Sequence, residues 1–201
     1  MSDADLTQSQ LSAGDQTLIM RLQRGEQNAV GELESRHGDE LRLFCRRMLT
    51  NPDAASDVVQ DVFATCCRLT AESLPQVSIR GWLYQLARRR CIDVIRKRRD
   101  DAGAGAAAVR RVQPSFDHAM DPLTTPAGKA LKRDRAERLL AVLDELDEDL
   151  RSVVVMRYFQ DLPREEIAEA IGLTLAGTKA RLSKAMLVLR EKLGDMGESL
   201  T

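Results

Sequence analysis

The residues with the clearest chemical potential are cations that gather near the end of one predicted helix, residues 81–100. Between positions 88 and 99 stand seven cations and a single acidic residue, Asp93, so the local charge is +6. The cations are Arg88, Arg89, Arg90, Arg96, Lys97, Arg98 and Arg99. This density of positive charge, close to Trp82 and Tyr84, is typical of a surface that binds nucleic-acid phosphates. The alternative is a solvated helix end that continues into a linker, and we favour phosphate binding.

A second basic surface is predicted near the C-terminus, on two helices joined by a glycine-centred turn, residues 161–193. Pro163 suits the first position of a helix, Gly172 can end that helix in the left-handed conformation, and Thr174 can cap the next helix. The outward side of the second helix then carries Thr174, Ala176, Gly177, Lys179, Ala180, Arg181, Ser183 and Lys184. Small residues edged by cations suit a helix that enters a DNA major groove, as in a helix-turn-helix. Taken by itself, this segment fits an ordinary amphipathic helical hairpin with a solvated basic face as well as it fits a helix-turn-helix.

An acidic surface is predicted on the helix that begins at Pro52, with Asn51 as its N-cap. One side of this helix is apolar and consists of Ala55, Val58, Val59, Val62, Phe63 and Cys66. Asp57, Gln60 and Asp61 remain on the other side. A solvated polar face is the usual meaning of this pattern, and an acidic patch for a basic protein partner is the alternative. The helix by itself leaves both interpretations open.

The remaining reactive side chains do not form a catalytic or metal-binding pattern. Four cysteines and two histidines are present: Cys45, Cys66, Cys67, Cys91, His37 and His118. They lack paired metal-ligand spacing, so we expect reduced core thiols, with a zinc or redox site as the minor alternative. No clustered nucleophile and base and no phosphate-binding loop appear in the sequence. We therefore expect no enzyme activity, catalytic residue, metal, cofactor or small-molecule substrate.

The elements that must position these surfaces are predicted to be helices. Hydrophobic residues make up 43% of the chain and aromatic residues only 3%, and the Leu, Ala, Val and Ile residues recur at helical spacing. This pattern predicts an all-α fold of two small helical domains, residues 15–100 and 131–201, the second with the helix-turn-helix. Residues 101–130 mix Ala/Gly runs with three prolines and predict a flexible linker. Residues 1–14 are polar and are expected to be disordered.

Within the first domain the apolar spacing predicts a helix from Asp15 that ends at Gly25. A second helix follows around residues 29–33 and a third from about Asp39 to Leu49. In the second domain a helix from about Lys132 ends in an acidic stretch, and the apolar run Val153–Tyr158 then continues the packing.

The chain is expected to be cytoplasmic and not inserted in a membrane. Its N-terminus, MSDADLTQSQ, is acidic and polar, and no apolar run is long enough to span a bilayer. The formal net charge of −1 hides the basic surfaces, because binding depends on local charge.

The order of these motifs resembles a bacterial extracytoplasmic-function (ECF) RNA polymerase sigma factor, over roughly residues 15–193 apart from the linker. DVVQDVF at 57–63 is similar to the helix that binds core polymerase, which implies this role for Asp57, Gln60 and Asp61. Residues 81–99 are similar to the helix that, with the preceding loop, melts and captures the minus-ten promoter element. That similarity implies DNA contacts by Arg80, Trp82, Tyr84, Arg88, Arg89, Arg96 and Lys97. Residues 146–172 resemble the family's last domain, whose recognition helix binds the minus-thirty-five element.

The resemblance implies a factor that binds core RNA polymerase and directs promoter recognition, melting and transcription initiation. Its implied partners are core polymerase, promoter DNA and, in some members, an anti-sigma factor. Several positions depart from the family pattern, which usually has an acidic residue at Ser56, an asparagine at Arg89 and arginines at Lys184 and Met186. The promoter sequence is therefore not predicted, whereas phosphate contacts survive these changes.

Two other classes of protein account for the sequence less well than a sigma factor does. A stand-alone helix-turn-helix transcriptional regulator accounts for residues 131–193 but leaves the acidic helix and the first basic helix without a role. A helical interaction protein needs neither basic surface.

The charge pattern also predicts that the two domains of the free protein dock on each other. The acidic stretch Asp144–Asp149 and the acidic helix at Asp57 and Asp61 can compete with DNA for the cations Arg88–Arg99. We therefore expect the free protein to bind duplex DNA poorly until core polymerase separates the domains.

Overall fold

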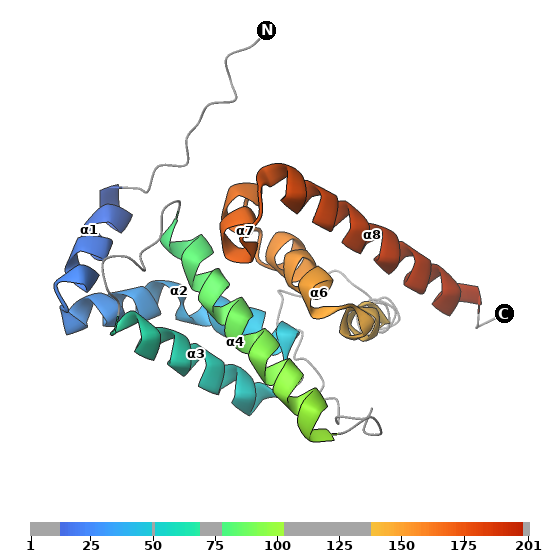
Figure 1. Cartoon of the computed structure of the whole chain (residues 1–201), viewed down its shortest axis with the longest axis horizontal. Coiled ribbons are helices and arrows are strands. Elements are labelled where there is room, and N and C mark those ends of the chain that lie inside the picture. Colours follow the sequence, from blue (N-terminus) through green and yellow to red (C-terminus); the bar gives the residue numbers. More distant parts are fainter. Residues whose placement is uncertain (1–12, 50, 69–77, 103–137, 199–201) are drawn as a thin grey trace, which may run out of the picture.

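The computed structural model describes residues 13–49, 51–68, 78–102 and 138–198, and across these residues the regular structure is helical, without strands (Figure 1). The helices are α1 (Ala13–Gln23), α2 (Gln27–Met48), α3 (Pro52–Cys66), α4 (Ile79–Ala102), α6 (Glu148–Val154), the π-helix η3 (Val155–Phe159), α7 (Arg164–Ile171) and α8 (Leu175–Glu198). Residues 138–145 are also helical. The predicted all-α fold is confirmed. The segments predicted to be disordered or flexible lie mostly outside the described residues, at 1–12 and 103–130.

The ends of several helices follow the predicted capping chemistry. The Asn51 side chain accepts hydrogen bonds from the backbone N–H groups of Asp53 (2.9 Å) and Ala54 at the start of α3. Gly172 ends α7 in the left-handed conformation, with φ 67°, and Thr174 Oγ1 accepts from the Gly177 N–H (3.1 Å) at the start of α8. These three predictions are confirmed. Pro163 is the residue before α7 and not its first residue, a shift of one position.

The prediction of two short helices between residues 29 and 49 is wrong, because α2 runs unbroken from Gln27 to Met48. Gly38 lies inside this helix. Buried side chains on one face of α2, including Leu33, Leu41 and Phe44, extend on both sides of the glycine. Packing of this face on the rest of the core outweighs the cost of about 1 kcal/mol that a glycine imposes inside a helix.

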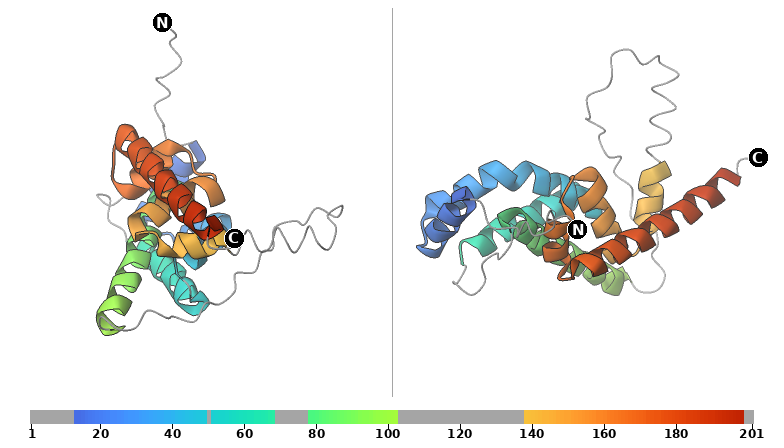
Figure 2. Two further views of the ribbon diagram at one scale, coloured as in Figure 1. Left: turned by 90° about the vertical axis from the view of Figure 1, so that its right-hand side faces the viewer. Right: turned by 90° about the horizontal axis from the view of Figure 1, so that it is seen from above.

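Two units, which we call the N-terminal unit (residues 13–102) and the C-terminal unit (residues 138–198), share one continuous buried core. Helix α4 packs on α2 and α3 and also on α7, while α6 and α7 both contact α8 (Figure 1). The last turns of α8 extend beyond the body of the molecule (Figure 2). The predicted docking of the two domains is therefore confirmed, and we call this arrangement the docked state. None of the described helices is both long and apolar enough to cross a membrane.

The apolar run after α6 is buried from Val153 to Met156, as predicted, but Tyr158 is 55% exposed, so its predicted packing is wrong. The backbone here forms a π turn, in which the Gln160 N–H donates to the Val155 carbonyl (3.1 Å). The wider turn changes the angle between successive side chains and leaves Tyr158 exposed.

Candidate protein and nucleic-acid interfaces

The acidic surface of α3 has the predicted orientation. Asp57, Gln60 and Asp61 are all exposed, and Val58 and Val62 on the opposite side lie in the core. Among the ion pairs of the described residues, none involves Asp57 or Asp61. The two carboxylates are thus available to a cationic partner.

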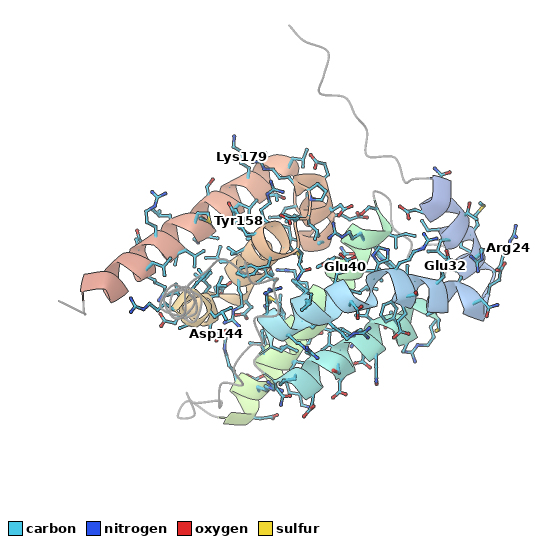
Figure 3. All side chains as sticks on the ribbon, turned by 180° about the vertical axis from the view of Figure 1, so that it is seen from behind. Arg24, Glu32, Glu40, Asp144, Tyr158 and Lys179 are labelled. Atoms are coloured by element: carbon cyan, nitrogen blue, oxygen red, sulfur yellow. The ribbon has the colours of Figure 1, made fainter. Side chains whose placement is uncertain are left out.

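The predicted DNA-binding side of α8 is mostly accessible. Ala176, Lys179, Ala180, Ser183 and Lys184 are exposed, and Gly177 is half-buried. Thr178 and Leu182 on the other side are buried. Lys179 lies near the start of α8, at the edge of the molecule (Figure 3).

Two predicted members of this surface already have partners within the chain. The Thr174 hydroxyl caps α8. Arg181 keeps 33% of its side chain exposed and forms an ion pair with Asp149, its Nη1 lying 3.4 Å from the carboxylate Oδ2.

The basic surface of α4 is accessible along only part of its length. Arg89, Arg96 and Lys97 are exposed. Arg88 is only 15% exposed; it forms an ion pair with Asp149, and its Nε donates to Ser152 Oγ (3.0 Å). Burial lowers the pKa of Arg88, and the Asp149 carboxylate opposes that shift. Arg88 is thus engaged by the C-terminal unit.

Trp82 and Tyr84 do not belong to an exposed surface in the docked state, so their DNA contacts remain a prediction for the separated units. Both are buried. The Tyr84 ring meets Phe44 edge-on at 5.1 Å, and its hydroxyl lies 3.3 Å from Gln160 Oε1 of the C-terminal unit. Burial raises the pKa of Tyr84. Neither aromatic ring can contact DNA while the units are docked.

Arg80 also lies at the joint between the units. Its Nη2 is 2.8 Å from Glu40 Oε2 of α2 and donates to the Gln160 carbonyl at 2.8 Å, and its Nη1 is 3.7 Å from Glu166 Oε2 of α7. Glu40, labelled in Figure 3, lies beside this joint. Sequence reasoning assigned Arg80 to DNA, and none of its three partners was predicted.

The two carboxylates that contact Arg80 have opposite pKa shifts. Burial raises the pKa of Glu166 more than Arg80 lowers it, and Glu166 Oε2 has no hydrogen-bond partner in the described structure. Burial also disfavours the charged form of Glu40, but hydrogen bonds from His37 and Arg80 outweigh this effect and lower its pKa. Glu166 is therefore the less well-satisfied carboxylate at the joint.

A carboxylate of the C-terminal unit also caps a helix of the N-terminal unit. Glu169 Oε2 accepts a hydrogen bond from the Ser78 backbone N–H (3.0 Å), while Ser78 Oγ accepts from the Gly81 N–H (2.8 Å). This reciprocal pattern resembles a capping box, except that the glutamate comes from α7 and not from the helix that it caps. Because the partner is distant in sequence, local spacing could not predict this cap.

The cysteines are free thiols. Cys45, Cys66 and Cys91 are buried, as predicted, but Cys67 is exposed at the end of α3, so the expectation of a core position is wrong for that residue. Burial raises the pKa of Cys66 to about 12. Across the described ranges, no three His, Cys, Asp or Glu side chains are placed to hold a metal ion.

Two family models match the chain in the order that these surfaces follow. Residues 33–100 match the model "Sigma-70 region 2", and residues 136–189 match "Sigma-70, region 4". Together they take up more than half of the chain.

Several full-length proteins are similar to this chain. The ECF RNA polymerase sigma factor SigW of Bacillus subtilis is 24% identical over 179 residues, which cover 89% of this chain and 96% of SigW. The RNA polymerase sigma-H factor of Pseudomonas aeruginosa is 28% identical over 182 residues, which cover 90% and 92% of the two chains.

Solved structures share the fold. CnrH in complex with the cytosolic domain of CnrY superposes with a TM-score of 0.62 at 23% identity, covering 90% of this chain and 97% of CnrH. The sigma factor RpoE of Bartonella quintana, in complex with the anti-sigma factor NepR, gives a TM-score of 0.59 at 20% identity, covering 82% and 96%.

Proposed function

Since the chain belongs to the sigma-70 family, as a sigma factor of the ECF type, we propose that it binds core RNA polymerase and directs promoter recognition, melting and transcription initiation. Sigma factors of this family are transcription initiation factors, and we infer no catalytic reaction and no cofactor for this chain. Its place of action would be the cytoplasm, with the polymerase and the promoter.

The single observation that carries this proposal is the presence of region 2 and region 4 in one chain, in that order. We assign residues 15–100 to region 2, 101–130 to the linker and 131–201 to region 4. A stand-alone helix-turn-helix regulator is not favoured, because such a protein has no counterpart of residues 33–100.

We assign polymerase binding to the acidic side of α3, where Asp57, Gln60 and Asp61 lie. The support is the accessibility of these side chains and the lack of ion pairs that compete for the two carboxylates in the described structure. Complementary charge would steer the acidic side of α3 toward a basic surface of the polymerase.

We assign promoter contacts to two surfaces. The side of α8 with Ala180 and Lys184 at its centre and Lys179 at its edge would enter the major groove of the minus-thirty-five element, because small and cationic residues there are exposed. The basic side of α4, with Arg89, Arg96 and Lys97, would contact the minus-ten element. Arg80, Trp82, Tyr84 and Arg88 would join it only after the two units separate.

Regulation by an anti-sigma factor is part of the proposal. RpoE of Bartonella quintana was solved with an anti-sigma factor, and CnrH with the cytosolic domain of CnrY. A protein of that class would act on this chain by holding it away from core polymerase.

The direct test is whether the purified chain associates with core RNA polymerase. Association is measured by the fluorescence anisotropy of a dye attached to the exposed Cys67 thiol. We expect saturable binding that the double substitution Asp57→Lys and Asp61→Lys abolishes. Absence of binding by the wild-type chain would overturn the proposal and favour the stand-alone regulator.

A further inference from the structure

The start of α8 presents apolar side chains to the outside of the molecule. Leu175, the first residue of the helix, is 50% exposed, and Ala176 and Ala180 are exposed as well. Thr178 and Leu182 lie in the core, so α8 is held with these three apolar residues outward. The part of α8 that leads into a DNA groove is thus mainly apolar.

The hydrogen-bonding side chains near the start of α8 are either engaged or lie elsewhere on the helix. The Thr174 hydroxyl already caps α8, and Arg181 forms its ion pair within the same unit. Lys179 lies at the edge of the outward side, and Ser183 and Lys184 lie about one turn further along. The centre of the leading turns therefore carries no side-chain donor or acceptor.

These positions matter because the N-terminal residues of a recognition helix contact base edges. This inference rests on the proposed function, which places α8 in the major groove of the minus-thirty-five element. Thymine is the base that presents a methyl group in the major groove. The edge of any other base, placed against an apolar side chain, would lose water from its donors and acceptors without gaining a hydrogen bond. An apolar leading turn therefore favours thymine.

We propose that Leu175, Ala176 and Ala180 are specificity-determining residues, which select thymine in the minus-thirty-five element by contact with its methyl group. Lys184, further along the same groove, supplies the hydrogen-bonding part of the readout, for which guanine offers two acceptors. The element that this chain recognises accordingly combines thymines, read by their methyl groups, with guanine.

The test uses the full chain bound to core polymerase and a pool of duplexes with a randomised stretch. One version of the pool is made with thymidine triphosphate and the other with deoxyuridine triphosphate, which removes only the methyl group. Duplexes retained by the polymerase-bound chain, and not by core alone, are sequenced. We expect the thymine pool to yield an upstream element with thymines that the uracil pool does not select, while guanines are selected in both pools.

The same comparison can be made on one selected duplex. Replacing a single selected thymine of the upstream element by uracil should weaken binding about fourfold. This is the equivalent of about 0.8 kcal/mol for one buried methyl-sized group.

The variant Ala180→Gln provides a change of specificity that a loss of folding cannot imitate. A glutamine at this position can form two hydrogen bonds to adenine, so adenine should replace thymine at one position of the upstream element. Leu193→Gln is the matched control. Leu193 is also exposed (39%), but it lies about 20 Å further along α8, beyond the same base pairs, so its selected element should be that of the wild type.

Two results would overturn the methyl readout: identical base preferences in the thymine and uracil pools, or an unchanged upstream element in Ala180→Gln. A wild-type chain that retains no duplexes beyond those retained by core alone would overturn the proposed function, and this inference with it. The two failures are distinguishable, because only the first leaves a selected element.

Discussion

Gly81, in the first turn of α4, is the position where a single methyl group should separate the two units. A Cβ atom at this residue would lie 2.7 Å from Glu169 Oε2 and 3.0 Å from the Glu166 backbone oxygen, both on α7. The nearest atom within its own unit is Ser78 Oγ at 3.1 Å. Gly81→Ala therefore acts mainly on the contact between α4 and α7.

The size of the effect follows from what each neighbour can do. The Glu169 side chain can move aside, but it then loses its hydrogen bond to the Ser78 N–H, and such a bond to a charged group contributes about 1.5–3 kcal/mol. The Glu166 oxygen is backbone and moves only with α7, and overpacking of that kind costs about 1–3 kcal/mol. The two costs overlap, so we expect the docked state to lose about 1–3 kcal/mol, a shift of about 5- to 150-fold in the docking equilibrium.

The higher helix propensity of alanine does not change the expected shift in the docking equilibrium. Alanine stabilises a helix by about 1 kcal/mol relative to glycine. Because α4 is helical whether or not the units are docked, that gain applies equally to both states and cancels from the docking equilibrium.

Hydrogen exchange of the Ser78 amide reports loss of the Glu169 contact, since that N–H is donated to Glu169, and binding of a mixed-sequence duplex reports separation of the units. We expect faster exchange in Gly81→Ala together with tighter binding of a mixed-sequence duplex. Gly31→Ala is the matched control: Gly31 lies in α2 and a Cβ there meets nothing within 4 Å, so only the helix gain applies. Wild-type exchange of Ser78 in Gly81→Ala would refute the reasoning.

Three further predictions concern single side chains. Asp61→Lys should weaken association with core polymerase by about a hundredfold, because like charges then face each other, with unchanged circular dichroism; normal binding would remove Asp61 from the interface. Lys179→Ala should weaken polymerase-bound promoter complexes similarly for all sequences and lower the slope of log affinity against log salt by about one, as measured by anisotropy; a changed sequence preference would instead indicate base contact. Glu166→Gln should raise the thermal stability at neutral pH by about 1 kcal/mol and have little effect near pH 4.5, its ordinary pKa. The sign follows from the raised pKa of Glu166: the docked state binds the proton more tightly, so the wild type loses stability as pH rises above 4.5, and an equal difference at both pH values would contradict this assignment.

The local features of the fold were predictable because they depend on neighbours in sequence. Asn51 and Thr174 cap helices through backbone groups two or three residues away, and Gly172 ends α7 by its own conformation. The exposed side of α3, with Gln60 and Asp61, follows from helical spacing alone. These signals lie within one or two turns of the chain.

The contacts between the units were only partly predictable. The distribution of charge along the sequence indicated that Asp144–Asp149 would meet the basic helix, and the ion pairs of Glu148 and Asp149 confirm it. No sequence signal placed Glu169 at the start of α4 or buried Tyr84 against Gln160, because these contacts join residues 91 and 76 positions apart. The acidic helix residues Asp57 and Asp61 were also expected to compete for the cations, but in the described structure neither forms an ion pair.

The most direct measurement of the central claim is transcription in vitro with core polymerase and genomic DNA from the organism that encodes this chain. The reaction is run with core alone, with core and the wild-type chain, and with core and the double variant Asp57→Lys and Asp61→Lys, and the 5′ ends of the transcripts are mapped. We predict discrete start sites that appear only with the wild-type chain and share sequence elements near minus ten and minus thirty-five. Transcripts identical to those of core alone would contradict the assignment of this chain as a sigma factor.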